Sequence, residues 1–346
     1  MLVKGIDWGF MRTETKLLCA STAIALFLGL STGLAPSQAI SIPSVSPKVA
    51  ALGLTGKLFY HRYGQYGDWK SKGFELDLAT GRLVRIDKLW TSAKSPLNIH
   101  PNPAGTEITF MGTATGLVEN EWDVFVSHWD GTKWADPINL TGPNNKRDED
   151  PKFSPNGHTV AYKEDGVMAT IEMDGTDKQL LTEGLPESSM PYFTSDGLGL
   201  IFERQGSIWL RDQAGVESKI WNRGITTAYY PINANVNKFL FTEVQSNRHD
   251  HIMMGYYNGD KAIPLFFGED YCDNSDPYPY KAAKRFIFYV STCPIPYKNY
   301  WKGGYNLMVA DRKTKKVYNM DAFNIKTNSH FLELGPAWSA TANMPQ

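Results

Sequence analysis

Short apolar runs that predict β-strands recur along the chain, each a few residues after a proline-containing turn. The clearest unit begins at Pro151, continues through a Ser-Pro-Asn-Gly turn and leads into an apolar run at 159–162. Similar units begin at Pro191 and Pro231, so that three prolines stand 40 residues apart. A weaker copy begins at Pro277, and another, at 98–110, lacks the leading proline but keeps the turn. A repeat of this length is the first feature to interpret, because it identifies arrays and propellers.

Each unit continues in the same way after its first apolar run. A further strand is predicted at 122–126, 169–173, 207–210 and 305–309. Turns with Asp-Gly or Asn-Gly follow several of these strands, and such dipeptides supply the positive φ that a tight hairpin needs. A last strand ends in Leu-Thr at 140–141 and 181–182. Four short strands in about 40 residues are the content of one propeller blade.

The two ends of the repeat region complement each other. Residues 334–339 look like the start of a repeat without its continuation, whereas residues 56–60 and 74–78 look like a continuation without a start. We therefore predict an all-β, six-bladed β-propeller at 56–340, closed by N- and C-terminal strands, which leaves no exposed sheet edges. A linker at 40–55 and a tail at 341–346 would flank it. The alternative is an open β-sandwich with coincidental proline spacing.

The first 39 residues read as an export signal. Basic residues Lys4, Arg12 and Lys16 precede an apolar run at 17–30, and small residues before Ala39 suit a signal peptidase. A membrane anchor is the competing interpretation, but this run is shorter than the roughly 20 residues that span a bilayer. We predict a signal peptide at 1–39 and a periplasmic or secreted protein. Met11 is an alternative start to Met1.

The composition of the chain limits the classes of partner that it could bind. The chain has 35 Lys and Arg against 36 Asp and Glu, with no basic patch, so nucleic acid is a poor candidate. No second long apolar segment exists, so the mature chain has no predicted membrane span, and we expect a monomer. Cys272 and Cys293 remain after cleavage, an even count that suits an oxidising compartment, where they could form a disulfide.

These repeats carry a family resemblance. The Pro-x-Phe-Ser-Pro-Asn-Gly element at 151–157, its variant at 191–197 and the Leu-Leu-Thr ending at 180–182 resemble the WD40-like repeat of TolB-type propellers. The resemblance spans roughly residues 56–339 and is specific in the two blades from 148 to 212. It implies a six-bladed propeller from an exported protein. The extra N-terminal α/β domain of TolB has no counterpart here, so nothing that depends on that domain is carried over.

The segments ahead of the inner strands should ring one mouth of the propeller channel. Because the equivalent places in consecutive repeats converge on the axis, we predict ligand binding there by Asp148, Asp150, Tyr229, Tyr230, Asp276 and Glu333. Asp150 and Asp276 precede prolines, which favours an extended backbone and a fixed acidic pair. Carboxylates, hydroxyls and aromatic rings could bind a sugar, a peptide segment or a cation. The alternative is that the acidic residues only cap turns.

His249 and His251 form the most metal-like stretch. Residues two apart on a strand point to one face, so the two imidazoles could chelate one divalent ion. The alternative is a pair of surface histidines on a hairpin, and no other cofactor is expected.

A propeller fold does not name its ligand. We expect a non-catalytic binding or scaffold protein of the cell envelope, with an envelope protein, a peptide or a carbohydrate as partner, and we assign no catalytic residue. The rival class is a polysaccharide-active enzyme, most plausibly a lyase, that works at the channel mouth with a Tyr or His base and carboxylates. A tight inward-facing group with His, Tyr and Arg, or a bound metal, would favour the enzyme.

Overall fold

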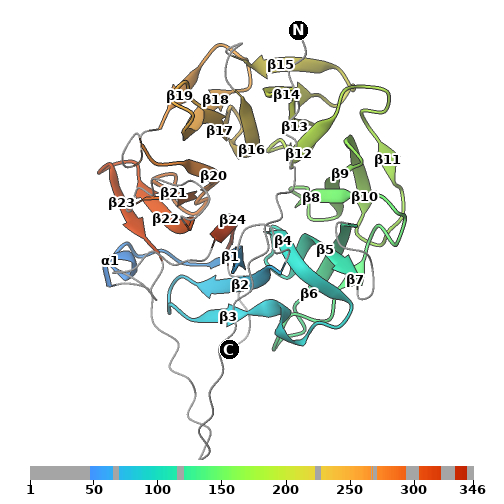
Figure 1. Ribbon diagram of the computed structural model, residues 1–346, viewed down its shortest axis with the longest axis horizontal. Coiled ribbons are helices and arrows are strands. Elements are labelled where there is room, and N and C mark those ends of the chain that lie inside the picture. The colour runs from blue at the N-terminus through green and yellow to red at the C-terminus, as the bar shows by residue number, and fades with distance from the viewer. Residues whose placement is uncertain are drawn as a thin grey trace, which may run out of the picture. The chain divides into compact units, whose positions relative to one another are not determined.

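A computed structural model describes residues 47–64, 70–114, 121–222, 227–265, 267, 271–293, 304–320 and 332–340. In this part of the chain, six four-stranded antiparallel sheets surround a central axis, as Figure 1 shows. The prediction of an all-β, six-bladed propeller is confirmed. The expected signal peptide at 1–39, both candidate start residues, the first part of the linker at 40–46 and the tail at 341–346 lie outside the described residues.

Each blade runs from an innermost strand near the axis to an outermost strand. Blade 1 is formed by β24 (Leu332–Ser339), β1 (Lys57–Tyr63), β2 (Lys72–Asp77) and β3 (Leu83–Arg85). Blade 2 is formed by β4 (Ala93–Pro101), β5 (Glu107–Ala114), β6 (Asp123–His128) and β7 (Ile138–Asn139). Blade 3 is formed by β8 (Asp148–Phe153), β9 (Thr159–Glu164), β10 (Val167–Glu172) and β11 (Gln179–Leu180).

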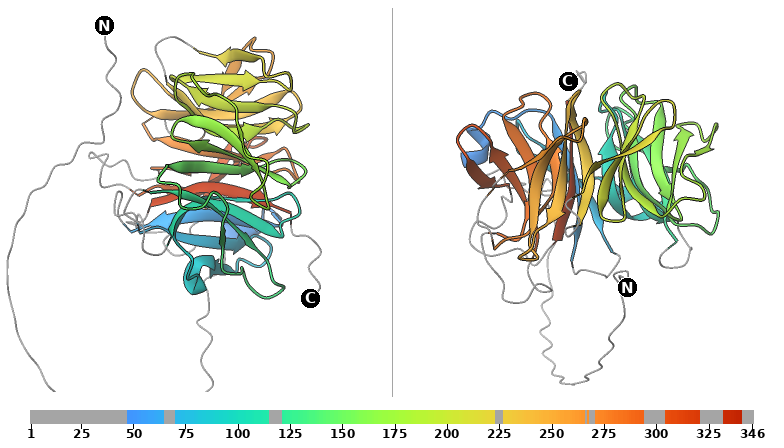
Figure 2. Two further views of the ribbon diagram at one scale, coloured as in Figure 1. Left: turned by 90° about the vertical axis from the view of Figure 1, so that its right-hand side faces the viewer. Right: turned by 90° about the horizontal axis from the view of Figure 1, so that it is seen from above.

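The other three blades follow the same order. Blade 4 is formed by β12 (Ser188–Phe193), β13 (Leu200–Arg204), β14 (Ser207–Arg211) and β15 (Glu217–Trp221). Blade 5 is formed by β16 (Ala228–Asn235), β17 (Lys238–Val244), β18 (Asp250–Tyr256) and β19 (Ala262–Pro264). Blade 6 is formed by β20 (Asn274–Pro279), β21 (Phe286–Ser291), β22 (Asn306–Asp311) and β23 (Lys316–Asn319). Because the blades stand edge-on around the axis (Figure 2), each sheet buries both of its faces against its neighbours.

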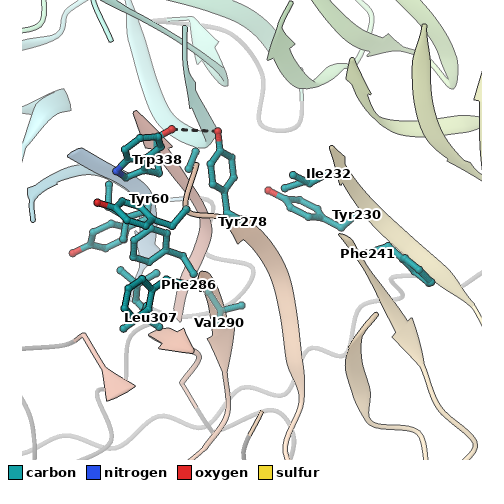
Figure 3. Close-up of a cluster of buried hydrophobic side chains, with 14 of the residues drawn as sticks. Tyr60, Tyr230, Ile232, Phe241, Tyr278, Phe286, Val290, Leu307 and Trp338 are labelled. Atoms are coloured by element: carbon teal, nitrogen blue, oxygen red, sulfur yellow. Dashed lines mark hydrogen bonds between the residues drawn. The ribbon is translucent and has the colours of Figure 1, made fainter. Parts of the chain in front are cut away.

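Closure joins the two ends of the propeller in blade 1. Strand β24 pairs antiparallel with β1, with Trp338 opposite Leu58. The Trp338 indole donates a hydrogen bond to the carbonyl of Thr55 over 2.8 Å, and its ring packs edge-on against Tyr280 of blade 6 at 4.9 Å between centroids. Figure 3 shows this aromatic cluster beside the channel. The predicted closure by strands from both ends is confirmed, and it explains why neither end of the repeat is complete by itself.

The last part of the expected linker packs on the propeller. Residues 47–50 form a short helix, α1 (Pro47–Ala50), and the side chains of Val49 and Leu54 are buried in the main apolar cluster. The backbone N–H of Thr55 donates to the Tyr280 hydroxyl over 3.0 Å. The ordered domain therefore begins ahead of residue 56. Within the described ranges, no helix has the length and apolarity to cross a membrane.

Candidate functional site

The six innermost strands share one distortion halfway along the channel. Each strand has a register shift against its neighbour there, with one residue at positive φ between 50° and 61°. These upper-tier residues are Asn98, Asp150, Met190, Tyr230, Asp276 and Gly335. All but Asn98 are followed by proline. The repeat proline is therefore the second residue of a β-bulge, since its missing N–H cannot serve the ladder.

The predicted backbone of Asp150 and Asp276 is corrected by this geometry. Both residues precede a proline, and an extended conformation was expected for them. Their φ values are instead 57° and 50°, in the left-handed region, because the bulge turns the backbone there. Non-glycine residues in this region cost free energy and persist where the surrounding structure holds them. The bulge repeats on all six inner strands, so it belongs to the architecture of the ring.

Upper-tier side chains are bonded to one another across neighbouring blades. The Asn98 amide donates to the Asp150 carboxylate over 2.6 Å, and the backbone N–H of Gly335 donates to the Asp276 carboxylate over 3.0 Å. His61 Nδ1 accepts the backbone N–H of Asn98 over 3.3 Å. Burial and the charge of Lys152 lower the pKa of His61 to about 3, so the imidazole is neutral. These contacts connect blades 6, 1, 2 and 3.

Lys152 lies at the centre of this arrangement. Lys152 stands two residues after the bulge residue of β8, and we call the residues at this position on the inner strands the lower tier. Its side chain is almost fully buried. The ammonium donates to the Pro151 carbonyl over 3.2 Å and lies 5.8 Å from the centre of the Tyr230 ring. Burial lowers the pKa of Lys152 to about 8, against the opposing charges of Asp150 and Asp276. Burial also raises the pKa of Asp276 to about 6.

A chain of hydrogen bonds crosses the channel in the lower tier. His100 Nδ1 accepts the backbone N–H of Phe153 over 3.3 Å, so Nε2 carries the proton and donates to the Tyr192 hydroxyl over 3.2 Å. Tyr192 interacts with the Tyr278 hydroxyl, which donates to the Trp338 carbonyl over 3.3 Å (Figure 3). Burial, Lys152 and Lys281 hold the pKa of His100 well below its usual value. Five blades are linked by this chain.

Four of the predicted site residues converge and two do not. Asp150, Tyr230 and Asp276 surround Lys152, while Tyr229 lies beside them and donates to Asp250 over 2.8 Å. Asp148 has other partners: Asn144 donates to its carboxylate, and Glu164 and Asp123 are its acidic neighbours. Glu333 pairs with Arg62 and accepts the backbone N–H of Leu307 over 3.0 Å. Apart from Tyr229 and Asp276, which retain some exposure, these residues are buried.

The predicted metal pair is divided between two environments. His249 Nδ1 lies 3.0 Å from the Asp273 carboxylate, whereas His251 faces Glu243 across the β17–β18 ladder and its Nε2 has no hydrogen-bond partner. No group of three metal-ligating side chains gathers within the described ranges. The two remaining cysteines, Cys272 and Cys293, are joined in a disulfide with 5.6 Å between their Cα atoms. This bond fastens the start of β20 to the end of β21.

Two open hollows lie at the end of the channel where the inner strands finish. A small hollow of about 130 Å³ fills the mouth beside His100, Tyr192 and Tyr278. A groove of about 510 Å³ leads outward between blades 5 and 6, and both hollows are lined by Asn233 and Lys281. We call this second hollow the interblade groove. Its volume falls in the range of small-ligand sites.

Sequence reasoning missed the lower tier. Lys152 and His100 stand two residues after a predicted or equivalent mouth residue, so strand alternation could have placed them on the channel side. Tyr192 and Tyr278 each directly follow a repeat proline, as Lys152 does, so the same reasoning applies to them. His61 had no such signal, because it lies on β1, the second strand of its blade.

Comparison of the structure with solved structures supplies the context. TolB from Acinetobacter baumannii superposes with a TM-score of 0.58 at 12% identity, over 82% of this chain and 66% of that protein. The chain has a TolB-like propeller fold. A putative TolB from Agrobacterium tumefaciens gives a TM-score of 0.53 at 14% identity, over 77% of this chain and 89% of that one.

Other proteins share the TolB-like propeller architecture. The structure of a nidogen/laminin complex matches with a TM-score of 0.56 at 12% identity, over 82% of this chain and 98% of that one. No family model and no curated protein matches the sequence. The chain spans just under two thirds of the Acinetobacter protein, so the likeness concerns the propeller fold alone.

Proposed function

We propose that this chain is an exported, non-catalytic binding or scaffold protein of the cell envelope. This function is supported by the hydrogen bonds that the side chains in the channel already form within the protein. Both ring nitrogens of His100 are engaged, one by the N–H of Phe153 and the other by Tyr192. A general base needs a free lone pair within reach of a substrate proton. The inward-facing polar groups are instead bonded to one another across the blades, which makes the ring a rigid support.

The proposed partner is an envelope protein, a peptide or a carbohydrate, bound by the propeller as a monomer outside the cytoplasm. Export rests on the leader sequence, whose apolar run is followed by small residues ahead of Ala39. The test is expression in a bacterial host with a C-terminal tag, followed by cell fractionation and intact mass measurement. We expect a periplasmic or secreted product that begins at residue 40. A product that retains residues 17–30 would contradict export.

A lyase acting on anionic polysaccharides is the second candidate. The specific observation in its favour is that a histidine, tyrosines and the buried Lys152 share one channel. Incubation of the mature protein with anionic polysaccharides, with and without added divalent metal, should yield no unsaturated product. Product formation that is lost in His100→Ala would replace the binding function with the enzyme. The same samples, analysed for bound metal, test the proposed divalent-ion site at His249 and His251.

A further inference from the structure

The interblade groove has an unusual distribution of charge for a nearly neutral chain. Among the described residues, its lining contains four cationic side chains and no carboxylate. These cations are Lys238, Lys281, Lys284 and Arg312. Lys238 is the first residue of β17, Lys281 and Lys284 lie in the β20–β21 turn, and Arg312 lies in the loop after β22. In the part of the chain that the structure describes, none of the four forms an ion pair. The neighbouring Arg285 and Asp311 form an ion pair with each other.

The cations are held by a rigid frame. Hydrogen bonds of 3.1–3.2 Å between backbone groups close the turn at 280–286, which presents Lys281 and Lys284 to solvent. The Lys238 ammonium lies 4.9 Å from the centre of the Tyr256 ring, and the Arg312 guanidinium donates to the Lys284 carbonyl over 3.3 Å. The charges of Lys238 and Arg312 are therefore positioned before a ligand binds, which reduces the entropy lost on binding.

The floor of the groove is apolar. It is formed by Leu240, Met254, Phe286 and Ile287, with Ala234 and Pro279 at its sides. Methionine adapts its shape to different apolar partners. A matching ligand therefore carries apolar groups as well as negative charge.

The hydrogen-bond donors and acceptors of the groove further limit the chemical class of its ligand. Lysine and arginine only donate. The side-chain oxygen of Asn235 already accepts the N–H of Asn237, and that of Asn233 accepts the Tyr257 hydroxyl. A saccharide rich in hydroxyl donors would find few free acceptors here. A peptide with carboxylates and carbonyl groups supplies acceptors for the four cationic donors of the groove.

We propose that the interblade groove binds an acidic peptide segment that alternates carboxylate and apolar side chains. The proposal deepens the proposed binding function and rests on it. Lys281 joins the groove to the channel mouth, since it lines both hollows and its charge reaches His100. The segment would lie across the end of the channel with its apolar side chains on the floor and its carboxylates at the four cations.

The test measures the binding of a fluorescein-labelled hexapeptide that alternates glutamate and leucine. The wild-type protein is compared with Lys281→Glu/Lys284→Glu and with a matched control, Lys313→Glu/Lys316→Glu, which has the same charge change on exposed residues of blade 6 outside the groove. We expect the groove variant to bind at least about tenfold more weakly, because each lost charge-assisted contact is worth about a factor of ten. The control should bind like the wild type, and added salt should weaken binding. Thermal melting verifies that both variants fold.

Three results with the hexapeptides alone would overturn the proposal: no binding of the acidic hexapeptide, equal binding by the two double variants, or undiminished binding of a glutamine-for-glutamate hexapeptide. A polyuronate hexamer and inorganic phosphate are tested in parallel. If the polyuronate binds without turnover while the peptide does not, the binding function stands and the peptide inference fails. If the polyuronate is cleaved, the binding function fails too. Peptide binding that phosphate displaces at equal concentration would reduce the site to one for simple anions, which also contradicts the proposal.

Discussion

Two regions of the propeller contain lysines, and they differ in what surrounds the charge. In the channel, Lys152 is buried beside Asp150 and Asp276, and the polar groups around it are bonded across the blades. In the interblade groove, Lys281 and Lys284 are exposed, and no carboxylate occurs among the lining residues that the structure describes. The charged groups in the channel interact with one another, whereas those in the groove are available to a ligand. The comparison teaches that a polar residue near the axis of a propeller is not thereby a binding residue.

The largest effect is expected from removing the strand that closes the ring. Deletion of residues 335–346 takes away most of β24, including Trp338 and the N–H that Gly335 gives to Asp276. Loss of one buried aromatic side chain alone costs about 3–5 kcal/mol, and the deletion also exposes the edge of β1 that pairs with β24. We expect the free energy of unfolding to fall by several kcal/mol in chemical denaturation. A truncated protein that melts within a degree or two of the full chain would contradict closure through blade 1.

A smaller, pH-dependent effect is expected from Asp276→Asn. The pKa of Asp276 is raised to about 6 in the folded protein, above its value of about 4 in the unfolded chain. The folded state therefore favours the protonated carboxyl, and this contribution to stability is present at low pH and lost as the pH rises through 6. The neutral amide avoids that loss, which is at most about 3 kcal/mol. Urea denaturation should show that the variant has a higher free energy of unfolding than the wild type at pH 7, but not at pH 4.

Lys152→Met should change the titration of a neighbouring histidine. The pKa of His61 is lowered to about 3 by burial and, secondarily, by the Lys152 charge. Removal of that charge should raise the pKa of His61, while burial keeps it below 6.5. Heteronuclear NMR of the imidazole follows the change directly. An unaltered pKa would mean that the two side chains do not share the channel centre.

The smallest effect on stability is expected in the groove. Lys281→Glu/Lys284→Glu changes two exposed residues that form no described ion pair. Exposed substitutions of this kind change stability by about 0.5 kcal/mol or less. Differential scanning calorimetry should therefore give nearly the wild-type melting temperature. A large decrease would mean that the groove charges support the fold.

The sequence predicted the ring, which the structure confirms, whereas the predicted binding residues stay a prediction. The prolines at 151, 191 and 231 recur because each inner strand repeats the same bulge, and a repeated backbone feature leaves a repeated residue. The residues around Lys152 were only partly predicted, because the bulge reverses the expected backbone at Asp150 and determines which side chains reach the axis. The groove left only a weak signal, the basic run at 281–285, since its cations come from separate turns that meet only after the blades pack.

The most direct test of the account is to measure acidic hexapeptide binding by a groove variant and a channel variant side by side. Lys281→Glu/Lys284→Glu should weaken binding by about tenfold or more at an unchanged melting temperature. Asp276→Asn should bind within about twofold of the wild type and differ only in the pH dependence of its stability. The reverse result, with binding lost in Asp276→Asn and kept in the groove variant, would contradict the account and return the site to the predicted mouth around Asp150, Tyr229, Tyr230 and Asp276.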